Sequence, residues 1–441
     1  MAEKKFNTLN PKATSEWNCK FTSIMGDSTE LAGIIDQLSI YESIFTNAMH
    51  GIIQIHDGVG FVEANGIIGS GEEKVHFEID TSMSTDALGK TANLEKEFAV
   101  SYVTAGQRTD KHTAYQIGIV SPYVIANNKK KISRSFTKST ASDIVQYVSD
   151  KVLLFGTLGG DAKEWTTCKI TPSKHPKEIV VPNWNPFHLI NFLAKNSVSA
   201  EGESNYLFFE NNEGFKFVTL DELLKGKSKR EMILKDNPLK SSQSGDSEIN
   251  VNDAIMEDYS ETQRFNIPNS QNNGHYGSSI LTHNILEKKL TKYEVEYDGE
   301  KDKVLAEGIG LNGTPGKPFK DFNVDQHTGL MSDNYLYQIH DKGEKSHYPL
   351  HDMKMSQLRT NIVKFSMAGD TNIFAGDVIT LKIASTIRDE TVTEEEDQYS
   401  TGKWLITAIH HKINNHEYTM TLECMKDGFF TDPEITIPAR G

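Results

Sequence analysis

The first candidate for chemistry is a glycine string in the second half of the chain. Gly308, Gly310 and Gly313 have the G-x-G-x-x-G spacing with which dinucleotide-binding proteins approach a pyrophosphate. That chemistry needs a buried strand before the string and the N-terminus of a helix after it. Residues 301–307 are largely charged, and residues 314–318 contain two prolines, so neither requirement is met. The context predicts a flexible surface loop and no bound nucleotide.

The neighbouring Gly316-Lys317 pair is a second candidate, because a phosphate-binding P-loop ends in Gly-Lys followed by Ser or Thr. Leu311 stands where the first glycine of that motif is needed. Pro318 stands where the magnesium-binding hydroxyl is needed. No nucleotide or other cofactor is therefore expected here.

Side chains that can ligate a metal gather in the segment 340–352. They are His340, Asp341, His347, His351 and Asp352. His347 and His351 have the i, i+4 spacing of zinc enzymes, but we expect Pro349 to keep them off a regular helical face. The prediction is a surface loop with ordinary histidines and no metal.

His410 and His411 are adjacent in a segment that alternates as a strand does. Successive side chains of a strand point to opposite faces of the sheet, so the two rings cannot act as a pair. We expect one ring to pack at the sheet and the other to meet solvent.

Hydrolase signatures are absent from the sequence. It contains no G-x-S-x-G elbow, no H-E-x-x-H motif and no cysteine in a family-type nucleophile context. Carboxylate pairs for glycoside cleavage are numerous in an acidic chain, and nothing singles one out. The sequence therefore assigns no catalytic, cofactor-binding or metal-ligating residue, and we expect no enzyme.

An acidic run, residues 389–397, lies between two strong strand patterns. One interpretation is a solvated loop whose charge keeps a strand edge from pairing. The other is a negative lining or a docking loop for a basic partner.

The composition is that of a soluble protein with several domains. The chain has 441 residues, of which 24% are charged and 37% hydrophobic, and at roughly 150 residues per domain it has room for about three domains. An excess of acidic residues gives a net charge of −15, which disfavours broad binding of DNA or RNA.

The three cysteines, Cys19, Cys168 and Cys424, are widely spaced and fit thiols packed as small core residues in a reducing cytosol. The start of the chain is polar, and no apolar run approaches the ~20 residues of a membrane helix. Neither export nor membrane insertion is expected.

The first secondary-structure elements that the sequence predicts along the chain are β-strands. Residues 75–79, 98–102 and 115–119 alternate with period two, and Phe98, Val100 and Tyr102 are predicted to share one face. Shorter apolar runs and turn signals lie between them. Six or seven antiparallel strands forming a barrel or sandwich are expected from about residue 16 to 121.

From about residue 140 the spacing of the apolar residues changes from a period of two to the period of 3.6 that is typical of α-helices. Thr140 is predicted to cap a helix that runs to residue 155, and Pro186 to begin a second helix. A hairpin is expected within 206–218, so this region reads as a small mixed α/β domain. Residues 236–275 read as a linker, and strand-like runs within 281–350 indicate a minor subdomain.

The last eighty residues carry the clearest strand patterns. They lie at 379–383, 404–409 and 417–424, and the middle one is apolar on both faces, which is typical of a central strand. A second β unit is therefore predicted to close the chain. Its rhythm of strands and glycines is similar to that of the first, a faint signal for an internal duplication.

The order of these segments has a counterpart in a known family. Residues 361–370, 374–379, 402–407, 409–411 and 417–422 resemble the final tube-type barrel of baseplate hub proteins from contractile-tailed bacteriophages, which are related to the VgrG hub of type VI secretion. The stretch 31–79, with Gly51 to Asp57 and Glu72 to Phe77, is similar to the family's first barrel.

The resemblance implies a mainly β (α+β) fold with two tail-tube-like antiparallel β-barrel domains, an inserted small α/β domain and a minor subdomain. The expected boundaries are 1–125 for the first barrel, 126–235 for the α/β insert, 236–280 for a linker and the start of the second barrel, 281–360 for the minor subdomain, and 361–441 for the second barrel.

The resemblance also implies a structural role in the virion, in the baseplate of a tail assembled from protein made in the host cytoplasm. Three chains would form a ring that joins the sixfold tail tube to the threefold central spike, with tape-measure and baseplate wedge proteins as further partners. DNA would pass through without specific binding, and a negative lumen would keep phosphates from adhering. Two alternatives from other classes stay open: a tail-associated cell-wall hydrolase, and a carbohydrate-binding protein with β modules.

Overall fold

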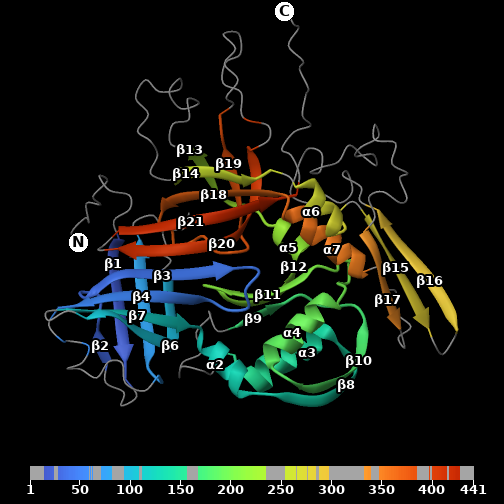
Figure 1. Cartoon of the computed structure of the whole chain (residues 1–441), viewed down its shortest axis with the longest axis horizontal. Coiled ribbons are helices and arrows are strands. Elements are labelled where there is room, and N and C mark those ends of the chain that lie inside the picture. Colours follow the sequence, from blue (N-terminus) through green and yellow to red (C-terminus); the bar gives the residue numbers. More distant parts are fainter. Residues whose placement is uncertain are drawn as a thin grey trace, which may run out of the picture.

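The computed structural model is mainly β, and one long sheet runs through it (Figure 1). It describes residues 14–23, 28–58, 60, 62, 71–81, 94–108, 112–155, 167–234, 254–264, 266–275, 277–284, 288–296, 332–338, 347–384, 397, 400–414 and 417–427. Among these residues the long sheet has 13 strands in the order β19-β13-β14-β18-β21-β20-β3-β4-β7-β6-β5-β1-β2.

The N-terminal half of this sheet comes from the first 120 residues, as the alternating pattern predicts. Its strands are β1 (Thr14–Thr22), β2 (Ser28–Glu30), β3 (Ile35–Ser43), β4 (His50–Asp57), β5 (Lys74–Thr81), β6 (Leu94–Arg108) and β7 (Thr113–Val120). Their neighbours in the sheet are all antiparallel. We call these strands the first β unit.

The C-terminal half closes on itself. Its strands are β13 (Ser228–Leu234), β14 (Ala254–Gln263), β18 (Asn361–Ala368), β19 (Val378–Lys382), β20 (Gly402–Asn414) and β21 (Glu417–Lys426). Because β19 pairs with both β13 and β20, these six strands form a closed barrel, which we call the second β unit. Closure leaves the described barrel without a free edge along the paired stretches.

β13 lies inside the range 126–235 that the sequence assigns to the α/β insert. Its ladders instead run to β14 and β19 of the second β unit. The partner residues of Met232, for example, are Ala254 and Leu381, so only the tertiary structure reveals where this short strand belongs.

The two β units share one topology. In chain order the first unit supplies β1, β3, β4, β5, β6 and β7, which lie side by side as β3-β4-β7-β6-β5-β1. The second supplies β13, β14, β18, β19, β20 and β21, which lie side by side as β14-β18-β21-β20-β19-β13. The two orders are identical position by position, although β5–β1 is antiparallel and β19–β13 is parallel. This agreement is the structural form of an internal duplication.

An α/β insert follows β7. It contains α2 (Pro122–Lys129), β8 (Ile132–Thr140), α3 (Ala141–Tyr147), the π-helix η1 (Val148–Leu153), β9 (Cys168–Ile170), β10 (Pro176–Trp184), α4 (Pro186–Lys195), β11 (Tyr206–Asn211), β12 (Gly214–Thr219) and α5 (Leu220–Leu224). The predicted cap is present, because the Thr140 hydroxyl accepts from the backbone of Asp143 and the Asp143 carboxylate accepts from the backbone of Thr140. The predicted single helix from 140 to 155 is instead an α-helix continued by a π-helix.

A three-stranded sheet lies within the second unit's sequence, between β14 and β18. It contains β15 (Gly277–Asn284), β16 (Lys289–Glu296) and β17 (Ser332–Gln338), flanked in sequence by α6 (Ile267–Asn272) and α7 (His347–Leu358). Figure 1 places this sheet at the far side of the insert from the first β unit. None of the described helices is both long and apolar enough to cross a membrane.

The hydrophobic cores explain how the parts hold together. One buried cluster contains apolar side chains of both β units, from Cys19 and Phe77 to Trp404 and Leu422. A second cluster lies inside the insert, and a third joins the insert to both β units. The third contains Ile44, Phe209 and Leu405, one from the first unit, one from the insert and one from the second unit. Burial of this shared apolar surface stabilises the arrangement of the three parts.

A buried lysine at the end of β21 gives a pH-dependent stability. Lys426 is 2% exposed, its Nζ lies 4.5 Å from the centre of the Trp404 ring, and burial lowers its pKa to about 7. Between pH 7 and the ordinary lysine pKa of 10.5 the unfolded chain binds this proton and the folded chain largely does not. Stability should therefore rise with pH across that window and lose this contribution as pH falls toward 7.

Replacing Lys426 with methionine should remove this dependence. We expect Lys426→Met to raise the free energy of unfolding at pH 7 by about 2 kcal/mol, after allowing for the lost cation–π contact, and to give less gain at pH 10. Urea unfolding at both pH values measures this, with Lys403→Met on the exposed side of β20 as the control. An equal gain at the two pH values would contradict the assignment.

Candidate assembly interface

The two β units meet along one antiparallel ladder between β3 and β20. It runs from Ala408 opposite Ser43 to Asn414 opposite Gln37. The first part of β20, Gly402 to Leu405, pairs instead with β19 and closes the second unit. β20 therefore pairs along its first part with β19 and along its last part with β3. It is thus the central strand that its apolar pattern predicts.

Thr407 marks the point where β20 changes partner. The ladder with β21 has a bulge between Ile406 and Ala408, which leaves Thr407 as the extra residue. Its hydroxyl donates to the Glu423 carbonyl at 3.1 Å, and its carbonyl accepts from the Ile44 backbone at 3.0 Å. The bulge thus bends β20 away from β19 and toward β3.

A buried polar network spans this ladder. Glu42 of β3 and His411 of β20 are each about 1% exposed, and Glu42 Oε1 lies 3.0 Å from His411 Nε2. His411 Nδ1 lies 2.7 Å from the Tyr418 hydroxyl, and burial raises the pKa of Tyr418 well above its ordinary value. The other Glu42 oxygen accepts from the Ala375 backbone at 3.2 Å. A carboxylate, an imidazole and a phenol in line can relay protons, but this depth of burial excludes a substrate, so the network holds strands together.

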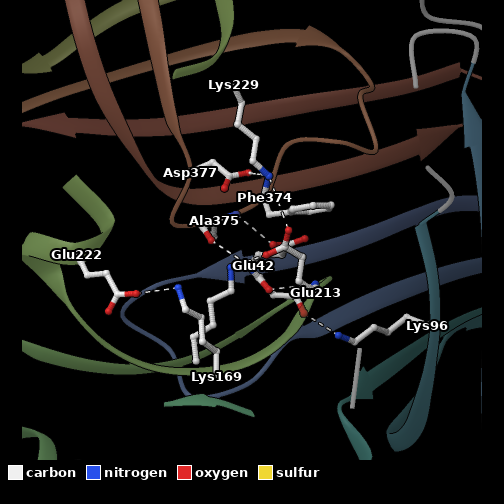
Figure 2. Close-up of polar contacts among 11 residues, drawn as sticks. Glu42, Lys96, Lys169, Glu213, Glu222, Lys229, Phe374, Ala375 and Asp377 are labelled. Carbon is white, nitrogen blue, oxygen red and sulfur yellow. Dashed lines mark hydrogen bonds and ion pairs between the residues drawn. The ribbon is translucent and has the colours of Figure 1, made fainter. Parts of the chain in front are cut away.

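The loop between β18 and β19 supplies further charges to the same region. Lys229 Nζ lies 3.2 Å from Asp377 and 3.7 Å from Glu213, and it lies over the Phe374 ring at 5.1 Å (Figure 2). Burial raises the pKa of Asp377, and Lys229 opposes that shift. The contacts of Lys229 therefore tie β13 to this loop and to the turn between β11 and β12.

Gly376 in this loop has a specific backbone requirement. Its φ of +95° is unfavourable for other residues, and a Cβ there would lie 3.1 Å from the Phe209 ring. Its backbone donates to the Ile406 carbonyl at 2.9 Å. The loop can therefore approach both the insert and β20 closely.

The insert is fastened to the first β unit by a buried ion pair. Lys96 of β6 and Glu210 of β11 are each 1% exposed, and Lys96 Nζ lies 3.2 Å from Glu210 Oε1. Lys96 also donates to the Asn211 carbonyl at 2.7 Å, and Glu210 accepts from the Met49 backbone at 3.1 Å. Asn211 in turn donates to the Ala375 carbonyl at 3.0 Å. The insert therefore contacts the first β unit through Lys96 and the β18–β19 loop of the second unit through Ala375.

The opposite face of the joined sheet is exposed and polar. Tyr41, His50 and His410 stack there, with ring centres 4.5 Å apart for Tyr41 and His410 and 5.2 Å apart for Tyr41 and His50. On the described parts of β3, β4, β7, β18, β20 and β21, this face carries three acids and three lysines: Asp36, Glu417, Glu423, Lys364, Lys403 and Lys412. Lys364 pairs with Glu423 at 2.9 Å. The face is therefore close to neutral although the chain is acidic.

The structure separates His410 and His411 as expected. His411 is buried in the network described above, and His410 is half-buried on the exposed face. Burial lowers the pKa of His410, with smaller contributions from His411 and Lys412. Adjacent residues of a strand thus have different environments.

The expectation for Pro349 is wrong. α7 begins at His347 and includes Pro349, because a proline is tolerated in the first turn of a helix, where its missing N–H would have no partner. His351 therefore lies in a helix and not in a loop. Its Nδ1 lies 3.0 Å from the Ser204 carbonyl, and burial lowers its pKa. Among the described residues, no group of three His, Cys, Asp or Glu side chains is placed to hold a metal ion.

The expectation for Tyr102 is also wrong. A bulge between Val100 and Tyr102 makes Ser101 the extra residue, so Tyr102 leaves the face of Phe98 and is 49% exposed. The three cysteines are free; Cys19 and Cys424 are buried, and burial raises the pKa of Cys19 and of Cys168 to about 12.

Two sequence candidates lie outside the described residues. They are the glycine string with Gly316-Lys317, and the acidic run 389–397 apart from Asp397. His340 and Asp341 lie outside them as well. Of this set the structure describes Asp397, whose backbone donates to the Ile383 carbonyl at 2.8 Å.

Glu42 and Lys96, whose buried contacts stabilise the interface, were not identified from the sequence, although the alternation of β3 and β6 marks both positions as core-facing. Glu42 follows Leu38 and Ile40 on the core-facing positions of β3, and Lys96 stands between Leu94 and Phe98 on those of β6. A charge at a core-facing position of a strand must find a buried partner. The pattern marks the charge but does not identify the partner.

The comparisons with known proteins agree with this architecture. The prophage MuSo2 43 kDa tail protein from Shewanella oneidensis matches 94% of this chain and 100% of its own, with a TM-score of 0.52 at 10% identity. A tail protein from Neisseria meningitidis MC58 matches 94% of this chain and 98% of its own, with a TM-score of 0.51 at 8% identity. The chain has the fold of phage tail proteins.

A weaker structural match has a TM-score of 0.44 at 7% identity, with 91% of this chain and 76% of the other covered. It is an E. coli component of the type VI secretion system, described as similar in structure to T4 bacteriophage tail proteins. The tail-protein fold rests on the first two matches alone. No protein-family model and no curated protein sequence matches the chain.

Proposed function

We propose that the chain is a non-enzymatic hub of a phage tail baseplate that assembles as a trimeric ring. The observation that carries this proposal is the repeated six-strand unit, joined edge to edge by the β3–β20 ladder. Three chains then supply six similar units, so that a threefold assembly presents nearly sixfold symmetry. Cyclic closure also gives each exposed strand edge a partner.

The sheet supports a ring with an open centre. Eight consecutive strands, β14-β18-β21-β20-β3-β4-β7-β6, are antiparallel neighbours within one chain. Three chains would together contribute 24 strands to one wall. Barrels of 16–22 strands already enclose a channel or a plugged lumen, so a 24-stranded wall has room for an open passage.

We propose that the polar face with Tyr41, His50 and His410 lines this passage. Because acids balance the lysines on this face, DNA phosphates would meet little net positive charge there. DNA would therefore move through without adhering. The net charge of −15 would suggest a strongly negative lining. DNA could pass without adhering even if the lining is close to neutral. The acidic surplus would then lie on the outside of the ring.

We propose a division into domains that the strand ladders support. We assign 14–121 to the first tube-like unit, 122–227 to the α/β insert, 266–358 to the minor subdomain, and 228–264 with 360–427 to the second tube-like unit. The tail tube would bind one rim of the ring and the central spike the other, in a virion. Tape-measure and baseplate wedge proteins are further partners that the tail-protein fold makes reasonable.

Light scattering coupled to size-exclusion chromatography tests the proposal. We expect a mass of three times the 49.4 kDa chain in dilute salt, either for the protein alone or after addition of the spike protein encoded with it. A particle that stays monomeric in both conditions would contradict the proposal.

A further inference from the structure

A crevice lies where the first β unit, the insert and α7 meet. It has a volume of about 810 Å³, which is within the range of binding pockets in proteins. The turn after β3 contributes one wall, α4 and β11 contribute the second, and α7 contributes the third. The crevice therefore borders the third hydrophobic cluster, which joins these parts of the chain.

The floor of the crevice is apolar. Ile44 and Leu207 belong to the buried part of the third cluster, and Phe45 and Met355 are only partly buried against it. Phe192 of α4 also lines the crevice, with 37% of its surface exposed. Large apolar side chains in a hollow favour an occupant that covers them with apolar side chains of its own.

The crevice carries more positive than negative charge. Lys195 and Arg359 are both exposed, and neither forms an ion pair with a carboxylate in the described part of the chain. The Arg359 guanidinium lies 4.9 Å from the centre of the Phe45 ring. Asp352 is the one acid among the residues that line the crevice. An acidic occupant therefore complements its charge.

The segment that follows β21 starts next to α7. Gln357 of α7 donates to the Asp427 carbonyl at 3.1 Å, and Asp427 is the last described residue. Residues 428–434, which lie outside the described residues, have the sequence Gly-Phe-Phe-Thr-Asp-Pro-Glu. Two adjacent phenylalanines followed by two acids match the apolar floor and the two cations of the crevice.

The path from the end of β21 to the crevice is short. Met355 and Gln357 are two residues apart, so they lie on opposite sides of α7, about 200° apart around its axis. A helix with its side chains is about 10–12 Å across. Three to four extended residues span about 10–14 Å. Because α7 ends at Leu358, the segment can pass around the end of the helix, next to Arg359.

We propose that residues 428–434 bind in this crevice of their own chain, with Phe430 on the apolar floor and Asp432 beside Arg359. Phe430 is three residues beyond Asp427 and Asp432 is five, which fits the length of the path. The bound segment extends the third hydrophobic cluster and ties the end of β21 to the insert. The proposal does not depend on the trimeric ring.

Spin labelling of the full chain tests this binding. A nitroxide on Thr431→Cys should give the spectrum of an immobilised label, in a Cys168→Ser background that leaves only buried thiols. Phe430→Ser should release the segment and give the spectrum of a mobile label. This substitution alters no residue of the described structure, so the fold of the described residues should stay intact.

Charge reversal tests the predicted partner of Asp432. Arg359→Glu should also give a mobile label, and adding Asp432→Arg should restore the immobilised spectrum. Arg134→Glu is the matched control, because Arg134 is likewise exposed and its guanidinium lies 4.5 Å from the centre of the Tyr147 ring. The control should leave the label immobilised. Circular dichroism shows whether each variant is folded.

A second label on Asn196→Cys, at the lining of the crevice, locates the segment. The distance between the labels at 196 and 431 should be short, and it should persist when the chain is produced together with an excess of chain that lacks both cysteines. Loss of the short distance under that dilution would place the segment in a second copy. A mobile label in the chain with an unaltered crevice would leave the crevice to another partner. An immobilised label that does not respond to Phe430→Ser and Arg359→Glu would place the segment elsewhere. Each of these three outcomes overturns the proposal.

Discussion

Replacing Lys96 with methionine should lower the free energy of unfolding by about 3–5 kcal/mol. The substitution leaves Glu210 buried at 1% exposure without the ammonium group 3.2 Å away, and removal of one partner from a buried pair has this cost. The Asn211 carbonyl also loses its donor. Since Lys96 joins β6 to the insert, we expect the insert to separate from the first β unit earlier during unfolding. Urea unfolding and hydrogen exchange of β11 measure the two effects.

The matched control is an ion pair that also involves β6. Lys74 pairs with Glu97 at 2.8 Å, but Lys74 is 48% exposed, so Lys74→Met should change stability by about 0–1 kcal/mol. If Lys96→Met costs no more than Lys74→Met, the buried pair does not fasten the insert.

Replacing Glu42 with alanine should have a similar cost, about 3–5 kcal/mol. It leaves the Ala375 backbone N–H and the His411 ring buried without their partner, and each such group costs about 1–3 kcal/mol, with a cavity adding to the loss. Because Glu42 joins β3 to β20 and to the β18–β19 loop, hydrogen exchange along the β3–β20 ladder should accelerate more than exchange within β5.

Two further variants separate the network from simple loss of volume. Glu42→Gln keeps an acceptor for Ala375 and a group that can bond to His411, so it should cost less than the alanine variant. The double variant Glu42→Leu with His411→Phe removes both members of the imidazole–carboxylate contact and should recover the part of the stability that Glu42→Ala loses at His411, while the Ala375 N–H and the Tyr418 hydroxyl still lose their partners. A double variant as unstable as Glu42→Ala would argue that packing alone, not the polar contact, holds this junction.

The strands of both β units could be predicted because their alternation is local. β5, β7 and β21 lie where the period-two pattern indicates, since each strand buries one face regardless of which strand pairs with it, and β20 lies where a run that is apolar on both faces indicates a central strand. Tyr102 shows the limit of the method. A single extra residue at Ser101 reverses the faces of β6, and nothing in the local sequence distinguishes that bulge from continuous strand.

The candidate interface was largely beyond prediction because it depends on distant partners. Glu42 and His411 are 369 residues apart, and Lys96 finds Glu210 across the insert. The alternation shows that each charge faces a core, but the partner follows only from the topology. The same holds for β13, whose neighbours β14 and β19 are fixed by barrel closure and not by its own seven residues.

Imaging of the purified chain by electron microscopy tests the central claim most directly. We predict particles with a central hole and threefold symmetry, in which six β lobes of two alternating kinds surround the opening. Particles without a hole, or rings with a number of chains other than three, would contradict a hub built from the repeated β unit.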